Sequence, residues 1–269
     1  MTDAKFESML VVGCGNMAGA MIEGWLAAGV DPTRFTLVDP ARAEGPHGLP
    51  IQKELPESGA FDAVLLAFKP QQLAEAAPAI APLAGPGTTV FSLLAGVELA
   101  TLAARFPNAG ALVRVMPNLA VALGKAPVAL AQQGLDVAAC EAALALFAPL
   151  GTPEWIGEDA FDLVTALAGS GPAFVYRFID ALGTGATRLG LDETQARALA
   201  LAMVEGAAAL AAGSEHSPGA LADMVASKGG TTRAGLDVLD EGEALTGLVT
   251  YCLRAARDRS AEMARETRS

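Results

Sequence analysis

The feature that most constrains the fold is a short buried strand followed at once by a glycine-rich turn and an amphipathic helix. Residues 8–12 form an apolar run, and GCGNMAGAMIEGWLAAG occupies residues 13–29. Gly13, Gly15 and Ala18 fill the small positions of the G-x-G-x-x-G/A pattern. These positions permit a tight turn, close approach of a pyrophosphate, and tight packing of the helix on the strand. The segment therefore predicts a nucleotide-binding α/β fold.

A second apolar run, residues 35–38, ends in Asp39, 24 residues after Gly15. An acidic side chain there is expected to accept hydrogen bonds from a ribose and to repel a 2′-phosphate, which favours NADH over NADPH. Arg42 could instead bind a 2′-phosphate, and Asp39 could be a solvated loop residue. The first predicted cofactor contacts are Gly13, Cys14, Gly15, Asn16, Met17, Ala18, Asp39 and Arg42.

Strand and helix patterns then alternate as far as residue 156. We expect strands near 62–68, 88–93, 112–116, 128–131 and 153–156, and helices near 71–80, 98–105 and 137–150. Alternation of this kind predicts a doubly wound parallel sheet of the Rossmann type, which binds ligands at the carboxyl ends of its strands. Further cofactor contacts are accordingly predicted at Ala67, Phe68, Lys69, Pro70 and Asn118.

Strand patterns disappear after residue 160, and the remaining sequence reads as helices. They are expected near 161–167, from 172 onward, and at 192–212, 218–226, 232–239 and 245–265. Helices so rich in alanine and poor in aromatic residues have little side-chain volume for a core of their own, so we expect them to pack against another subunit. The predicted domains are residues 1–157, for the dinucleotide, and residues 158–269, an all-helical domain for dimerisation and substrate.

The segment LADMVASKGGTTRAGLDVLD, residues 221–240, interrupts two helical patterns at Gly229 and Gly230. Two glycines let the backbone approach a ligand, and the helix that follows begins with unpaired N–H groups that attract a carboxylate or phosphate. Hydroxyl groups that could donate to such an anion belong to Ser227, Thr231 and Thr232. The alternative is an ordinary helix corner with a threonine cap.

Composition excludes several other functions. A formal net charge of −12 argues against nucleic acids and anionic membranes as partners. The three cysteines are far apart and the two histidines are distant, so neither a disulfide framework, a metal site nor histidine-based hydrolysis is supported. The apolar helical spans carry charges that a bilayer-crossing helix rarely has, and no targeting segment is recognised, so we expect buried thiols in a cytoplasmic protein.

Six segments together are similar to the pyrroline-5-carboxylate reductase family. They are GCGNMAGA, FKPQ, SLLAGV, RVMPN, TALAGSGPAFVY and MVASKGGTTRAGLDVL, and the likeness covers about residues 8–253. One departure is Leu119-Ala120, where the family usually has Thr-Pro. The resemblance implies NAD(P)H-dependent reduction of the C=N bond of 1-pyrroline-5-carboxylate, a cyclic imino acid, to L-proline in the last step of proline biosynthesis. It also implies homodimers formed through the helical domain, often assembled into decamers.

The resemblance also implies roles for the segment at residues 221–240. Backbone N–H groups and hydroxyls of Gly230, Thr231 and Thr232 would hold the substrate carboxylate, with Ser227 and Gly229 beside them, and Thr232 would be the catalytic donor or proton relay at the imine nitrogen. Glu215 matches an acidic position near the substrate, although it could be a surface turn residue. Alternatives are a reductase of another imine or 2-oxo acid, and a non-catalytic dinucleotide-binding protein.

Overall fold

The computed structural model describes residues 5–268 and contains two compact units. The first unit comprises the described residues up to Gly169 together with those from Ala255 onward, and the second comprises Ser170–Arg254. The C-terminal turns of the chain therefore belong with the N-terminal sheet. The domain division predicted at residue 157 stays a prediction.

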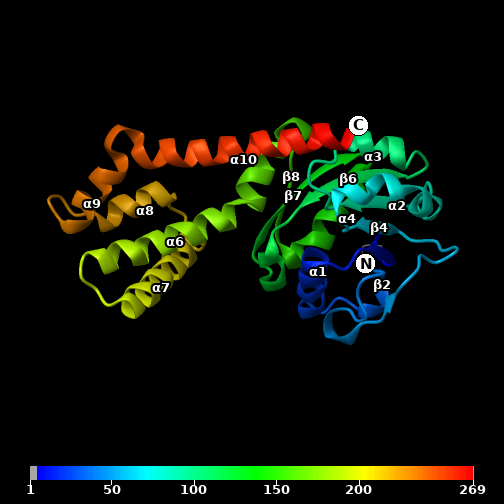
Figure 1. The fold of residues 1–269 in the computed structure, drawn as a ribbon, viewed down its shortest axis with the longest axis horizontal. Helices are drawn as coiled ribbons and strands as arrows, with labels where there is room; N and C mark the ends of the chain where they lie inside the picture. The colour runs from blue at the N-terminus through cyan, green and yellow to red at the C-terminus, as the bar shows by residue number, and fades with distance from the viewer. Residues whose placement is uncertain (1–4, 269) are drawn as a thin grey trace. The chain divides into compact units, whose positions relative to one another are not determined.

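The first unit is built on one eight-stranded sheet with strand order β3-β2-β1-β4-β5-β6-β7-β8 (Figure 1). The strands are β1 (Met9–Val12), β2 (Phe35–Val38), β3 (Ile51–Gln52), β4 (Ala63–Leu66), β5 (Thr89–Ser92), β6 (Ala111–Met116), β7 (Ala126–Gln133) and β8 (Gly151–Trp155). All neighbouring strands are parallel except β6 and β7, which are antiparallel. The doubly wound Rossmann-type prediction is confirmed, but the sheet is only mostly parallel, because β7 and β8 run opposite to the other six strands.

Helices cover both faces of this sheet. They are α1 (Asn16–Ala27), α2 (Leu73–Ile80), α3 (Leu99–Arg105), α4 (Val137–Phe147) and α5 (Phe161–Val164). Short 3-10 helices lie at Pro32–Arg34, Pro46–Gly48, Pro70–Gln72, Ala81–Leu83, Leu119–Leu123, Ala148–Leu150 and Glu158–Ala160, and a π-helix at Thr165–Gly169.

The central strands are apolar throughout because both faces are covered. All four residues of β1 are buried: Met9 and Val11 pack with α1 and α4, while Leu10 and Val12 pack with α2 and α3. Trp25 on α1 is fully buried, and its Nε1 donates to the carbonyl oxygen of Leu146 at 2.8 Å. Two hydrophobic cores, one on each face of the sheet, thus fix the positions of the carboxyl ends of the strands.

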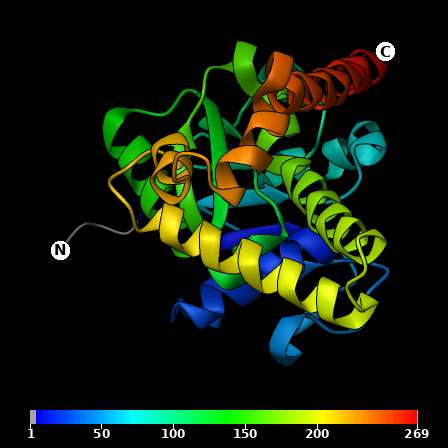
Figure 2. The same ribbon diagram turned by 90° about the vertical axis from the view of Figure 1, so that its left-hand side faces the viewer.

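The second unit contains helices but no strand among its residues. Its helices are α6 (Gly171–Arg188), α7 (Glu193–Ala212), α8 (Pro218–Val225), α9 (Thr231–Asp240) and the first turns of α10 (Ala244–Arg268), with a 3-10 turn at Glu241–Glu243. Helices α6 and α7 lie side by side (Figure 2). They approach closely at Gly183, where an added Cβ would lie 3.4 Å from Arg197 Cα.

Large apolar side chains remain exposed on the second unit. On α7, Leu199, Met203 and Leu210 are all more than half exposed, and their spacing places them on one face of the helix. Among the described residues, α7 is the one helix long and apolar enough to cross a membrane by length and composition, although it carries Arg197 and Glu205. Exposed apolar surface on this scale is typical of an interface between subunits.

The three cysteines differ in their surroundings. Cys14 is buried, whereas Cys140 and Cys252 are only partly buried, so the expectation of three buried thiols was correct for Cys14 alone. All three are free thiols. Cys14 lies in the glycine-rich turn, where its backbone has a structural role.

Candidate functional site

The glycine-rich turn packs directly against the end of β4. Gly13 has φ +89°, and a Cβ there would lie 2.8 Å from both the carbonyl carbon of Ala67 and the backbone nitrogen of Phe68. A side chain at this position would meet both a strained backbone and a clash with main-chain atoms. Glycine is therefore required at residue 13, and two predicted groups of cofactor residues come together at this point.

The N-terminus of α1 is open. Its N-cap residue, Gly15, provides no side-chain cap, and a Cβ added to Gly15 would meet nothing within 4 Å. Ala18, one turn into the helix, is buried and packs on the sheet, as the small position of the motif requires. The first N–H groups of a helix have no partner within the helix, and Gly15 places no side chain beside them, so this end of α1 can bind phosphate oxygens.

The end of β2 is bonded to this turn through Asp39. The Oδ2 atom of Asp39 accepts a hydrogen bond from Cys14 N at 2.8 Å, and its Oδ1 atom accepts one from Ala41 N at 2.8 Å. Arg42 Nη2 donates to Asn16 Oδ1 at 3.3 Å, across the N-terminus of α1. Desolvation raises the pKa of the Cys14 thiol above its ordinary value, against the opposing effect of the Arg42 charge. Predicted residues from two segments are thus brought together.

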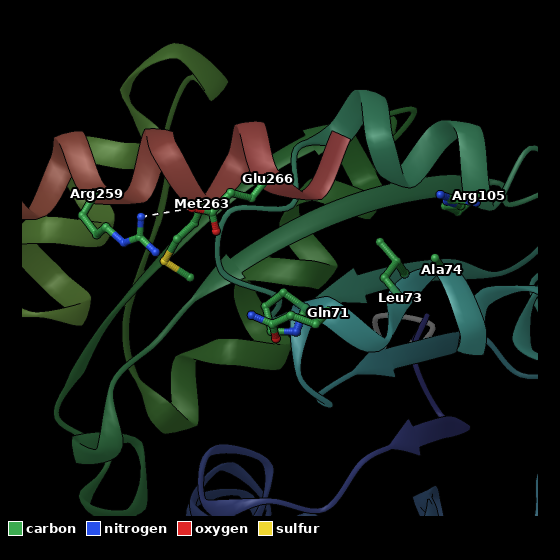
Figure 3. A pocket seen from close by; sticks show the side chains of 8 residues that line it. Gln71, Leu73, Ala74, Arg105, Arg259, Met263 and Glu266 are labelled. Carbon is green, nitrogen blue, oxygen red and sulfur yellow. Dashed lines mark hydrogen bonds and ion pairs between the residues drawn. The ribbon is translucent and has the colours of Figure 1, made fainter. Parts of the chain in front are cut away.

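Lys69 and Pro70 start the 3-10 helix that leaves β4. The Lys69 side chain is exposed, and its backbone nitrogen donates to Gln72 Oε1 at 3.2 Å. Pro70 and Gln71 form one side of a cavity of about 320 Å³, and Arg259, Met263 and Glu266 of α10 line it too (Figure 3). Sequence reasoning missed this cavity, because nothing in the pattern of α10 shows that its end returns to the sheet.

Arg259 in this cavity is already paired. Its Nη1 donates to Glu262 Oε2 at 3.0 Å and to Glu266 Oε1 at 3.1 Å, the latter drawn as a dashed line in Figure 3. These hydrogen bonds, first the one to Glu262, raise the pKa of the guanidinium above its ordinary value. The positive charge of Arg259 is therefore paired within α10 and is not available to bind an anion.

Asn118 is buried at the end of β6, and both ends of its amide bond to the protein. Its Nδ2 donates to the carbonyl oxygen of Ala168 at 2.9 Å, and its Oδ1 accepts from Ala120 N at 2.9 Å. The residue thereby joins the sheet edge to the π-helix at Thr165–Gly169. Its predicted contact with nicotinamide or substrate stays a prediction.

In the second unit, the segment between α8 and α9 forms the turn expected from Gly229 and Gly230. Gly229 has φ +72°, and the backbone nitrogen of Gly230 donates to Ser227 O at 2.9 Å. A side chain on Gly230 would collide with Ser227 Oγ. Ser227, Gly229 and Gly230 are therefore brought together at the start of α9.

The N-terminus of α9 is also uncapped. Its N-cap residue is Gly230, which has no side chain to bond the first N–H groups, and Thr231 and Thr232 are exposed in the first turn. The threonine cap considered as an alternative is not the arrangement found. The turn presents backbone donors and two hydroxyl groups, a combination that suits a carboxylate.

Arg233 connects the helices on either side of this turn, a contact that the sequence pattern did not reveal. Its guanidinium lies 3.6 Å from Asp223 on α8, and 3.4 Å and 3.7 Å from Asp237 and Asp240 on α9. Glu215 lies exposed in the bend between α7 and α8. Within the described part of the chain, no cluster of His, Cys, Asp or Glu residues could hold a metal ion.

A Rossmann-type sheet with an open glycine-rich turn, followed by a helical unit with exposed apolar faces, defines a dinucleotide-dependent oxidoreductase that assembles through its helices. Residues 158–263 match the family model for pyrroline-5-carboxylate reductase dimerisation, and residues 9–140 match the one for ketopantoate reductase PanE/ApbA.

Relatives extend the match over nearly the whole chain. A pyrroline-5-carboxylate reductase of Pseudomonas aeruginosa is 34% identical over 95% of this chain and 96% of its own, and pyrroline-5-carboxylate reductase 2 of Bacillus subtilis is 33% identical over 94% and 93%. The chain belongs to the pyrroline-5-carboxylate reductase family.

Solved structures agree with this assignment. A pyrroline-5-carboxylate reductase from Coxiella burnetii has a TM-score of 0.86 at 28% identity, covering 96% of this chain and 99% of that one. The Plasmodium falciparum pyrroline carboxylate reductase, solved with NADP bound, has a TM-score of 0.78 at 22% identity, covering 98% and 99%, and shows the same fold.

Proposed function

We propose that this protein catalyses the NAD(P)H-dependent reduction of 1-pyrroline-5-carboxylate to L-proline, the final step of proline biosynthesis. The observation that carries the proposal is the uncapped N-terminus of α9, where the turn at Gly229 and Gly230 leads into Thr231 and Thr232. A small cyclic imino acid has one carboxylate and one C=N nitrogen, and this turn offers donors for both. Membership of the reductase family supports the same substrate.

The residues at the carboxyl edge of the sheet fit a nicotinamide dinucleotide. Gly15 leaves space at the N-terminus of α1 for the pyrophosphate, and Gly13 lets the turn lie against the end of β4. When bound, the reduced cofactor supplies the hydride. Asp39 at the end of β2 favours NADH by repelling a 2′-phosphate. The residues proposed to contact the cofactor are Gly13 to Ala18, Asp39, Arg42, Ala67 to Pro70, and Asn118.

The turn before α9 binds the substrate carboxylate. Backbone N–H groups of Thr231 and Thr232 are donors fixed by the start of the helix, and the helix dipole favours a negative charge there. The Gly230 N–H is bonded to Ser227 O, so Gly230 contributes by shaping the turn. Ser227 Oγ lies against Gly230 and adds a hydroxyl. Because these donors are already held in place by the turn, little conformational entropy is lost when the carboxylate binds. A carboxylate bound to fixed donors holds the imine in one orientation.

A protonated iminium accepts hydride far better than a neutral imine, so the site has to deliver or stabilise one proton. The Thr232 hydroxyl orients the imine nitrogen or passes a proton from water, because a threonine hydroxyl is too weak an acid to protonate it alone. Glu215, in the bend before α8, balances the iminium charge.

The helical unit forms the subunit contact. Residues 158–263 match the family model for pyrroline-5-carboxylate reductase dimerisation, and the exposed face of α7 supplies the apolar area. We propose that the protein is a homodimer which assembles further into decamers and that it functions in the cytoplasm. It acts on a small molecule rather than on nucleic acid or membranes.

Thr232 provides the test of the proposed mechanism. Replacing it with alanine should lower kcat/KM for 1-pyrroline-5-carboxylate by about 100-fold, and Thr232→Ser should recover most of that loss. Thr246→Ala, an exposed threonine outside the turn, is the matched control. An unchanged rate in Thr232→Ala would remove Thr232 from the mechanism.

A further inference from the structure

The strand β3 is only two residues long, yet it holds the segment that follows β2. Ile51 and Gln52 pair with Leu37 and Val38, and the backbone nitrogen of Asp39 donates to Gln52 O at 3.0 Å. The pairing stops there, at the first residue of the 39–42 turn. The next residue along the strand direction is Lys53.

The Lys53 side chain continues the contact that β3 begins. Its Nζ atom donates to the carbonyl oxygen of Pro40 at 3.2 Å and also to the carbonyl oxygen of Arg42. Two carbonyl dipoles that point at one place repel each other, and an ammonium group there removes the repulsion. Lys53 has three donors, so one charge bonds both oxygens of the turn.

The Asp39 carboxylate bonds to the same turn from within. Asp39 Oδ1 accepts from Ala41 N and Asp39 Oδ2 accepts from Cys14 N, both at 2.8 Å. The Ala41 N–H therefore faces Asp39, whereas the carbonyls of residues 40 and 42 face Lys53. The orientation of the Asp39 carboxylate and the position of Arg42 both depend on this turn keeping its shape.

We propose that Lys53 is a positioning residue for the adenosine-ribose end of the cofactor site, acting through the 39–42 turn. This inference rests on the proposed function, since it assumes that a dinucleotide binds at the N-terminus of α1. Lys53 does not touch the ribose. It holds the turn in the conformation that aims Asp39 at the ribose hydroxyls, so that the site is formed before the cofactor arrives.

The test uses ADP-ribose, which contains the adenosine, the pyrophosphate and a second ribose but cannot transfer hydride. Isothermal titration of the full-length protein should give a Kd about fivefold to tenfold higher for Lys53→Met than for the unsubstituted chain. Lys53→Arg, which keeps the charge and several donors, should restore binding to within about twofold. Lys125→Met, at another exposed lysine of the first unit, is the control and should bind normally.

Kinetics separate positioning from general damage. Lys53→Met should raise the KM for the reduced cofactor and leave kcat and the KM for the imine unchanged, because the pyrophosphate of the cofactor separates its adenosine ribose from the nicotinamide that carries the hydride. A fall in kcat together with a lower melting temperature would assign Lys53 to stability alone and overturn the proposal.

A double-mutant cycle tests whether Lys53 acts through Asp39. In an Asp39→Asn background, Lys53→Met should have little further effect on ADP-ribose binding. Additive losses would overturn the proposal. So would a loss confined to 2′,5′-ADP, which would make Lys53 a direct phosphate contact. If the unsubstituted chain binds ADP-ribose but does not reduce 1-pyrroline-5-carboxylate, the proposed substrate fails while this test stands.

Discussion

Glu158 Oε1 lies 2.9 Å from Arg114 Nη1 and also accepts a hydrogen bond from Leu99 N at 2.9 Å. Arg114 is buried within β6, and its guanidinium lies 4.0 Å from the centre of the Phe161 ring. One carboxylate oxygen therefore joins β6, the start of α3 and the segment that leads out of the sheet. This charge pair holds β6 and the start of α3 in place next to the segment at Glu158–Ala160.

Replacing Glu158 with glutamine should destabilise the first unit. The buried Arg114 would keep its charge without a carboxylate partner, which is costly in a poorly hydrated position. Because the Glu158 side chain is 36% exposed, we expect a loss of about 2 kcal/mol rather than the larger value for a fully buried pair. Urea unfolding would measure it, and a change below about 0.5 kcal/mol would show that the pair is not important for stability.

Alanine substitutions at Gly13 and Gly15 should have different consequences. Gly13→Ala meets backbone atoms of the β4 end and a positive φ, so both stability and cofactor binding should fall. Gly15→Ala meets no protein atom within 4 Å and should fold normally, but its methyl group would hinder close approach of the pyrophosphate to the backbone, so ADP-ribose binding should weaken by about tenfold. Melting temperature and calorimetric Kd distinguish the two.

Gly85→Ala provides the control, because that glycine also has open space around its Cβ position and lies outside the predicted site. Normal ADP-ribose binding by Gly15→Ala would mean that no pyrophosphate binds at the start of α1.

The thiol of Cys14 should make stability depend on pH in the alkaline range. Burial raises its pKa in the folded protein, so folding favours the protonated form. This contribution is fully present below the thiol pKa of the unfolded chain and is lost as pH rises through the raised folded value. The stability advantage of the unsubstituted chain over Cys14→Ala should therefore shrink as pH rises above the ordinary pKa of a cysteine thiol, as measured by urea unfolding. An advantage that stays constant or grows would contradict the assignment.

A charge on the exposed face of α7 should prevent assembly. Leu199→Asp or Met203→Asp places a carboxylate on the face proposed to meet another subunit, where it would be desolvated without a partner. Light scattering should then report the mass of a single chain instead of a multiple. Glu205→Asp on the same helix retains the native charge and should assemble normally. A Met203→Asp variant that still assembles would place the contact elsewhere.

The sequence contained enough information to predict the sheet and the two glycine turns, because these depend on local properties. The apolar run of β1 and the small residues Gly13 and Gly15 are readable in order along the chain. The two-residue strand β3 was missed because Ile51 and Gln52 are too few to show alternation. The reversal of β7 and β8 was missed because the direction of β7 is set by the Leu119–Leu123 connection rather than by the strand residues, and β8 follows β7 in parallel.

Long-range contacts were beyond sequence reasoning for a different reason. Ser260 on α10 donates to Asp162 at 2.8 Å, and these residues are nearly a hundred positions apart. Nothing in the helical pattern of α10 shows that its last turns rejoin the first unit. Lys53 likewise has no motif, since its role depends on two carbonyls brought together by folding.

The most direct test of the account is the initial rate of reduced-cofactor oxidation with 1-pyrroline-5-carboxylate, measured in parallel with NADH and NADPH. We predict turnover with formation of L-proline, and a higher kcat/KM with NADH because Asp39 repels the 2′-phosphate. A preference for NADPH would transfer control of the ribose site to Arg42. Absence of turnover with both cofactors, in a folded protein that binds ADP-ribose, would contradict the proposed reaction and direct the search to other imines.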